Sequence, residues 1–125
     1  SSIYRNLEYF VPNKLNVEKM QEAVKYFEGE HDFKAFKASG TSSKSSVRII
    51  YKTKVEKQGD RIIIELTGNG FLYNMVRIIA GTLVEVGLGK IEPNEIPEII
   101  EKGERTRAGK TLPPQGLYLV KVEYQ

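Results

Sequence analysis

The chain has 125 residues, enough for one domain with a single hydrophobic core. Hydrophobic residues make up 40% of it and charged residues 28%, which is ordinary for a globular protein, and no apolar run approaches the roughly 20 residues of a membrane span. It has no cysteine and one histidine, His31, which excludes disulfides and leaves little scope for a metal cluster. We therefore expect a cytoplasmic, metal-free domain.

The net charge of +3 is unevenly distributed along the sequence. Basic residues dominate 31–61 and 102–110, whereas acidic residues dominate 62–101. Such segregation suits a protein that presents one basic face to a polyanion. A merely solvated surface explains it equally well, because lysines on strands and loops are common without any ligand.

The first third of the sequence predicts a strand, a helix and a turn. Residues 3–10 are rich in aromatic residues and partly alternate, as in a strand. Asn16 is a good N-cap for a helix whose apolar residues recur at helical spacing up to Phe27, and Gly29 should stop it. Residues 31–36 predict a short turn that packs two phenylalanines.

The rest of the sequence predicts a hairpin, two helices and a last strand. A serine-rich loop at 39–46 precedes the hairpin. The hairpin consists of strands at 47–57 and 61–67 joined by Gln58-Gly59-Asp60. A buried helix at 70–86 follows, and then a short helix at 93–102 with Asn94 as N-cap and Gly103 as its stop. The chain continues with a basic loop at 104–110 and a strand at 116–124. The predicted order is β-α-β-β-α-(α)-β. This is an α+β, ferredoxin-like fold, with a four-stranded antiparallel sheet and helices on one face.

Arg77 is the most unusual residue of the sequence because it stands within the apolar run Met75 to Ile79. A buried arginine must pair with an anion or lose its hydration at a large cost, so we expect a largely buried guanidinium that has a partner. Tyr73, Ala80 and Gly81 lie on the same helical stripe, which could let an anion approach. An arginine at the edge of the core, or an ion pair to Glu65 or Glu85, would also explain it.

The segment around Arg77 also carries a resemblance to a known family. GNGFLYNMVR at 68–77, followed by GTLVEVG at 81–87, resembles the signature helix of the A-type tRNA pseudouridine synthases. Three further blocks agree with that family in order and spacing: GEHDF at 29–33 with Phe36, Val47-Arg48, and PPQGLYLV at 113–120. The resemblance runs from about residue 16 to the end of the sequence.

This resemblance implies a cofactor-free isomerase that converts uridine to pseudouridine in the anticodon arm of tRNA and works as a homodimer. In that family a catalytic aspartate stands in a Gly-Arg-Thr-Asp motif of the N-terminal half. Matched residue by residue, Arg77 corresponds to the basic residue that pairs with this aspartate, and Leu117 to the hydrophobic residue that walls the uracil pocket. By pattern alone, Leu117 is a core residue of the last strand.

The sequence departs from the family at the catalytic motif. Its only aspartates are Asp32 and Asp60, and neither follows Gly-Arg-Thr. We therefore expect residues 1–125 to be a single domain, the C-terminal half of the enzyme, with the catalytic N-terminal half absent. Such a chain should be inactive alone, and its partners should be tRNA and the N-terminal half.

The basic stretches supply the expected phosphate contacts, which give affinity while RNA shape gives specificity. These residues are Lys44, Arg48, Lys52, Lys54, Arg105, Arg107 and Lys110. Two other functions remain open on this fold, which fixes no activity by itself. One is a non-catalytic RNA-binding module, although the aromatic strand motif of its best-known form is missing. The other is a regulatory or oligomerisation domain.

Overall fold

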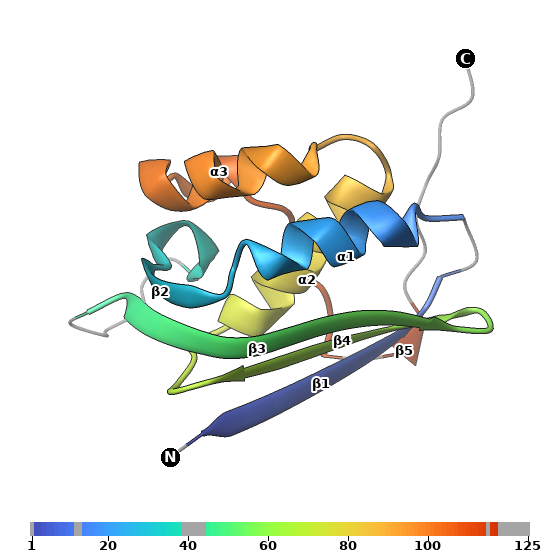
Figure 1. The fold of residues 1–125 in the computed structure, drawn as a ribbon, viewed down its shortest axis with the longest axis horizontal. Helices are drawn as coiled ribbons and strands as arrows, with labels where there is room; N and C mark the ends of the chain where they lie inside the picture. The colour runs from blue at the N-terminus through green and yellow to red at the C-terminus, as the bar shows by residue number, and fades with distance from the viewer. Residues whose placement is uncertain (1, 12–13, 39–44, 115, 118–125) are drawn as a thin grey trace.

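A computed structural model describes residues 2–11, 14–38, 45–114 and 116–117. One sheet forms one layer of the molecule, and three helices lie together on one side of it (Figure 1). The helices are α1 (Val17–Lys25), α2 (Met75–Gly87) and α3 (Ile96–Lys102), and the 3-10 turns are η1 (Lys34–Phe36), η2 (Pro93–Glu95) and η3 (Arg105–Arg107). The strands are β1 (Ile3–Phe10), β2 (Gly29–Asp32), β3 (Val47–Gln58), β4 (Arg61–Gly68) and β5 (Gly116–Leu117).

The strand order in the sheet is β2-β3-β4-β1-β5. Strands β2, β3, β4 and β1 are antiparallel neighbours, which confirms the predicted α+β fold with a four-stranded antiparallel sheet and helices on one face. The predicted hairpin between β3 and β4 is present, and β1 and β3 flank β4 as in a split βαβ unit.

Two strands differ from the sequence-based expectation. Residues 29–32, predicted to end a helix and begin a turn, form β2 against the start of β3. Its GEHD sequence has no apolar alternation, because β2 is an edge strand whose residues are mostly exposed. Within the expected strand 116–124, the described residues 116–117 pair with β1 in the parallel direction, and residues 118–124 lie outside the described part.

One hydrophobic core fills the space between the sheet and the helices. Asn16 caps α1 as predicted, with its Oδ1 accepting a hydrogen bond of 3.1 Å from the Lys19 N–H. Phe27, Phe33 and Phe36 are fully buried, and Phe36 meets each of the other two edge-on. The predicted packing of two phenylalanines is therefore confirmed.

The outer edge of β3 is covered by side chains of α1 and the turn after it. Strand β2 pairs with β3 only at residues 47–50, so the backbone beyond this point needs other partners. Gln21 Nε2 donates to the Val55 carbonyl at 3.0 Å, and Lys25 Nζ donates to the Thr53 carbonyl at 2.7 Å. Glu28 accepts from the Thr53 N–H at 3.0 Å. These bonds satisfy backbone groups that would otherwise be open to another strand.

Helix α2 begins five residues later than predicted, at Met75. Asn74 has φ of 60° and ψ of 3°, and an α-helix cannot pass through a left-handed residue. Residues 70–74 therefore form a turn in front of the helix. Among the described residues, Asn74 is the one non-glycine residue with positive φ.

Residues 109–112 cross α2 in close backbone contact. The Gly109 N–H donates to Thr82 Oγ1 at 2.8 Å, and the Leu112 N–H donates to the Arg77 carbonyl at 3.2 Å. At Gly81 a Cβ atom would collide with the Lys110 carbonyl, so this crossing requires glycine. The crossing buries the outer side of α2, which explains why the helix is apolar on most of its surface.

The short helix near 93–102 has a different cap from the one predicted. Glu92, not Asn94, is the capping residue of η2, and it forms a reciprocal capping box with Glu95. Asn94 lies inside the 3-10 turn, where it cannot act as N-cap. Gly103 ends α3 at φ of 67°, as predicted.

Candidate functional site

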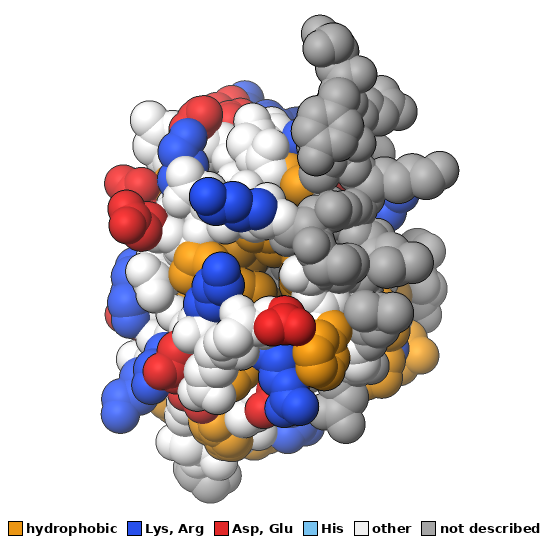
Figure 2. Space-filling view, turned by 90° about the vertical axis from the view of Figure 1, so that its right-hand side faces the viewer, with side chains coloured by type: hydrophobic (Ala, Val, Ile, Leu, Met, Phe, Trp, Pro, Cys, Tyr) orange, Lys and Arg blue, Asp and Glu red, His pale blue; other side chains and the backbone are white. Residues whose placement is uncertain are grey.

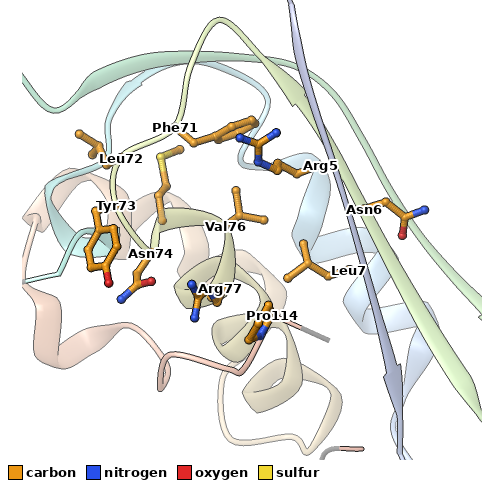
Figure 3. Close-up of a pocket in the computed structure, with 11 residues that line it drawn as sticks. Arg5, Asn6, Leu7, Phe71, Leu72, Tyr73, Asn74, Val76, Arg77 and Pro114 are labelled. Atoms are coloured by element: carbon orange, nitrogen blue, oxygen red, sulfur yellow. The ribbon is translucent and has the colours of Figure 1, made fainter. Parts of the chain in front are cut away.

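A pocket of about 500 Å³ opens between β1, the turn 71–74 and the first turn of α2 (Figure 3). Its lining residues are Arg5, Asn6, Leu7, Phe71, Leu72, Tyr73, Asn74, Met75, Val76, Arg77 and Pro114. In Figure 3, β1 supplies one wall and the turn 71–74 the wall opposite. The pocket therefore gathers residues 5–7, residues 71–77 and Pro114, which lie far apart in the sequence.

Arg77 lines this pocket from the first turn of α2. It is half-buried, so it is less enclosed than we expected. Within the described residues its guanidinium has no hydrogen bond or ion pair, and both acids proposed as partners are engaged elsewhere. Glu65 accepts from the Tyr4 hydroxyl at 2.9 Å, and Glu85 lies 3.8 Å from Lys90. Of the alternative explanations of Arg77, an ion pair to Glu65 or Glu85 is therefore absent from the described residues.

The stripe of small residues behind Arg77 does not serve as an approach to it. Ala80 and Gly81 are buried under the 109–112 crossing, so an anion cannot reach the guanidinium from that side. Access to Arg77 is from the pocket, at the N-terminal end of α2. An anion beside Arg77 stays a prediction. It would reach the guanidinium through the pocket and not along the stripe of small residues that the helical spacing indicated.

Arg5 is a second arginine of the pocket, and sequence reasoning missed it. It stands in β1, opposite Leu66 in register, and its Nη1 donates to the Tyr4 carbonyl at 3.2 Å. Among the described residues that line the pocket, none is acidic. Two guanidinium groups without a counter-charge give the pocket a positive potential, which favours an anionic ligand. An exposed arginine near a strand end carries no sequence signal by itself.

Tyr73 and Asn74 form the wall opposite Arg5 and Leu7. Tyr73 is 68% exposed, the largest exposure among the large hydrophobic side chains described. Asn74 Oδ1 is buried and has no hydrogen-bond partner among the described residues. The ring open to solvent at this wall of the cationic pocket is therefore that of Tyr73, while the neighbouring amide oxygen of Asn74 is enclosed by the fold.

Tyr9 fixes the part of the chain that closes the pocket near Pro114. Its hydroxyl donates to the Pro113 carbonyl at 2.6 Å, and its ring is almost fully buried. Burial raises the pKa of Tyr9 well above its ordinary value, while the nearby positive charge of Arg77 acts in the opposite direction. Tyr9 therefore stays a neutral hydrogen-bond donor.

The predicted phosphate contacts on β3 lie outside this pocket. Lys52 and Lys54 are exposed and alternate with the buried Thr53 and Val55, which places them on the sheet face turned away from the helices. Lys54 Nζ lies 3.4 Å from Glu56. Arg48 is half-buried, and its Nη1 donates to the Ser45 carbonyl at 2.9 Å. Lys44 lies outside the described residues.

The predicted contacts in the basic loop are partly used within the fold. Arg105 Nη1 donates to the Gly109 carbonyl at 2.8 Å. Arg107 lies 3.9 Å from Glu95 and 3.6 Å from Glu98. Lys110 is exposed. Fewer of the loop's positive charges are therefore available to a ligand than its sequence indicates.

Leu117 contributes its backbone to β5, opposite Phe10 of β1. Its side chain lies outside the description, so its expected place in a uracil pocket stays a prediction. The 500 Å³ pocket reaches as far as Pro114 in this part of the chain.

The surface that includes the β3–β4 hairpin end carries charges of both signs. Figure 2 shows Lys and Arg interspersed with Asp and Glu, with hydrophobic side chains between them. Phe10, 40% exposed, holds the Arg61 guanidinium 4.9 Å from its ring centre. Within the described part, no three His, Cys, Asp or Glu side chains gather where they could bind one metal ion, and no helix is long and apolar enough to cross a membrane.

Comparison with known proteins identifies the family. A family model described as tRNA pseudouridine synthase matches residues 23–125. The tRNA pseudouridine synthase A of Acetivibrio thermocellus is 54% identical over 124 residues, and that of Ruminiclostridium cellulolyticum is 57% identical over 125 residues. Each match covers 99% of this chain and 51% of the relative, so the chain spans about half the length of these curated relatives. The chain belongs to the tRNA pseudouridine synthase family.

Proposed function

We propose that this chain is the C-terminal half of a tRNA pseudouridine synthase, the half that binds RNA and completes the active site. The whole enzyme would isomerise uridine to pseudouridine in the anticodon stem-loop of tRNA, as a cytoplasmic homodimer. The observation that supports this most is the pocket with Arg5 and Arg77 and no described acidic residue in its lining. A site with positive charge and no acid of its own suits an acid supplied by another part of the enzyme.

In this proposal Arg77 pairs with the catalytic aspartate of the other half. An adjacent guanidinium keeps a carboxylate ionised and can hold it in one orientation by paired hydrogen bonds. An ionised, oriented aspartate can act as nucleophile or base on a uracil ring. The apolar side chains of the pocket, such as Leu7 and Val76, would then surround an unstacked base.

The exposed lysines of β3 supply the other part of the function. Lys52 and Lys54 stand on the open face of the sheet, where a phosphate backbone could reach them without disturbing the core. Contacts of this kind give affinity that falls steeply with salt. They would position the tRNA, while the pocket would act on one of its bases.

A chimeric enzyme tests the proposal. This chain would replace the C-terminal half of the Acetivibrio thermocellus relative, and pseudouridine formation would be measured on unmodified tRNA. We expect turnover by the chimera, none by residues 1–125 alone, and loss of most turnover with Arg77→Met. Turnover by the chain alone, or an unchanged rate with Arg77→Met, would overturn the assignment. Tight tRNA binding by an inactive chimera would favour the non-catalytic RNA-binding module instead.

A further inference from the structure

Tyr9 holds the chain that follows the crossing over α2 at two places, Pro113 and Gly116. Its backbone pairs with Gly116 at the start of β5, and its hydroxyl donates to the Pro113 carbonyl at 2.6 Å. The residue is 1% exposed. Filling the core does not require the hydroxyl, because a phenylalanine ring has nearly the same shape and needs no polar partner. The contribution that is specific to tyrosine is therefore the bond to Pro113.

The same part of the chain is bonded to Arg77 on its other side. The Leu112 N–H donates to the Arg77 carbonyl at 3.2 Å, and Pro114 lines the pocket together with Arg77. Pro113 and Pro114 have no N–H with which to make a further bond, and both are exposed, so burial in the core does not fix them. Within the described residues, two hydrogen bonds thus fix this wall relative to the guanidinium, one to α2 and one to Tyr9.

We propose that Tyr9 is a positioning residue of the active site, which fixes the wall of the pocket at Pro113 and Pro114 beside Arg77. The inference rests on the proposed function and adds to it a residue that does not itself line the pocket. Arg5, Leu7 and Tyr9 alternate along β1 and therefore share one face of the strand. This face supplies two residues of the pocket and, next to them, the hydroxyl that holds its Pro114 wall.

Loss of the hydroxyl should affect the chemical step more than the binding of RNA. Without it the Pro113 carbonyl has no described partner and can turn towards water, which lets the wall at Pro114 shift relative to Arg77. An error of about 1 Å in the placing of reacting groups can lower a rate by up to about a hundredfold. The affinity for tRNA comes mainly from phosphate contacts, which this proposal places on β3, so it should hardly change.

Amide hydrogen exchange of the 125-residue chain tests the structural link. Tyr9→Phe removes the hydroxyl and keeps the ring. Thr53→Val is the matched control, because it also removes one buried hydroxyl, whose bond of 2.7 Å to Glu28 lies at the edge of β3 and outside the pocket. We expect Tyr9→Phe to speed exchange of the Leu112 N–H at least about tenfold more than exchange of the Ile64 N–H in the core. Thr53→Val should show no such selective effect on Leu112.

The chimeric enzyme tests the consequence for the reaction. Tyr9→Phe should lower the single-turnover rate of pseudouridine formation about tenfold, because the wall and Arg77 are no longer held in one arrangement. Its affinity for tRNA should stay within about twofold of wild type, and Thr53→Val should keep both rate and affinity.

Three results overturn this inference and leave the proposed function standing. The first is an unchanged rate in Tyr9→Phe, and the second is an equal loss of rate in Thr53→Val. The third is an exchange rate of the Leu112 N–H that changes no more than that of the core. An inactive wild-type chimera overturns the proposed function and, with it, the role of Tyr9 in the reaction.

Discussion

Glu28 accepts two hydrogen bonds from one residue, the Thr53 N–H at 3.0 Å and the Thr53 hydroxyl at 2.7 Å. Lys25 lies 3.4 Å from the same carboxylate and also donates to the Thr53 carbonyl. One carboxylate and one ammonium group thus satisfy every polar group of Thr53 at the edge of β3 that β2 does not pair with. This arrangement has a pH dependence that can be measured.

The free energy of unfolding should fall at acid pH partly through Glu28. Burial of Glu28 raises its pKa, but the hydrogen bonds from Thr53 and the charge of Lys25 outweigh this, and the pKa is lowered from 4.5. A lowered pKa in the folded state stabilises the fold fully above pH 4.5, and this stabilisation is lost as the pH falls through the folded-state pKa. In urea titrations, Glu28→Gln should reduce the fall in the free energy of unfolding as the pH is lowered below 4.5. Glu22→Gln, on the exposed face of α1, should leave this fall unchanged. An equal fall in wild type and Glu28→Gln would contradict the role of Glu28.

The left-handed backbone at Asn74 predicts an unusual order of stabilities. Asn74→Gly should be neutral or slightly stabilising, because glycine adopts positive φ without a Cβ clash. Asn74→Ala should be less stable than the glycine variant by about 1 kcal/mol. Urea melts of the three proteins measure the difference. An alanine variant as stable as the glycine variant would show that α2 shifts to a different starting residue.

The crossing over α2 makes Gly81 sensitive to a single methyl group. Gly81→Ala would place a Cβ against the Lys110 carbonyl, and the forced shift should cost about 1–3 kcal/mol. Gly70→Ala is the matched control, since its Cβ would meet nothing closer than Arg48 Nε at 3.6 Å. Thermal melts compare the two, and similar melting temperatures would mean that the loop moves aside without cost.

Arg77→Met should act in opposite directions in the chain and in a complete enzyme. In the 125-residue chain the change removes a half-buried charge that has no described partner, so stability should stay the same or rise. In the chimeric enzyme it should remove most pseudouridine formation, measured in single-turnover experiments, while Arg77→Lys should keep part of it. A strongly destabilised Met variant of the chain would mean that Arg77 serves the fold.

Salt dependence separates the two groups of predicted phosphate contacts. Replacing Lys52 and Lys54 by alanine should lower the log–log salt slope of tRNA binding by about 0.7 to 0.9 for each lost contact. Replacing Arg105 and Arg107 should change the slope less and lower stability, since both already hold partners within the fold. Lys90 and Lys102, exposed on the helix side, serve as the control pair. A larger slope change for the arginine pair would place the RNA on the basic loop.

The sequence predicted the elements whose pattern is local. Asn16, the hairpin residues 58–60 and Gly103 work as expected, because a cap or turn depends on a few neighbouring residues. Strand β2 was missed, since a polar edge strand exists only through pairing with β3. The start of α2 was misplaced because the sequence of residues 70–74 does not reveal that the backbone of Asn74 is in the left-handed conformation.

The candidate site was predicted less completely than the fold. Arg77 was identified from its apolar neighbours, and the structure brings it into a pocket. Arg5 was missed because its importance depends on β1 lying beside the turn 71–74, a contact between distant parts of the chain. The internal partners of Arg107 were missed for the same reason, since Glu95 and Glu98 reach it only after the chain has turned back at Gly103.

The backbone contact between Gly81 and Lys110 holds in place the segment that forms one side of the pocket. Residues 109–112 cannot slide along α2, and the Tyr9 hydroxyl holds Pro113 just beyond them. The wall at Pro114 is therefore fixed by backbone and side-chain contacts, and we expect a bound ligand to shift it little. Any adjustment to a bound molecule should therefore come from the opposite wall, where the Tyr73 side chain is 68% exposed, so the pocket should open from one side only.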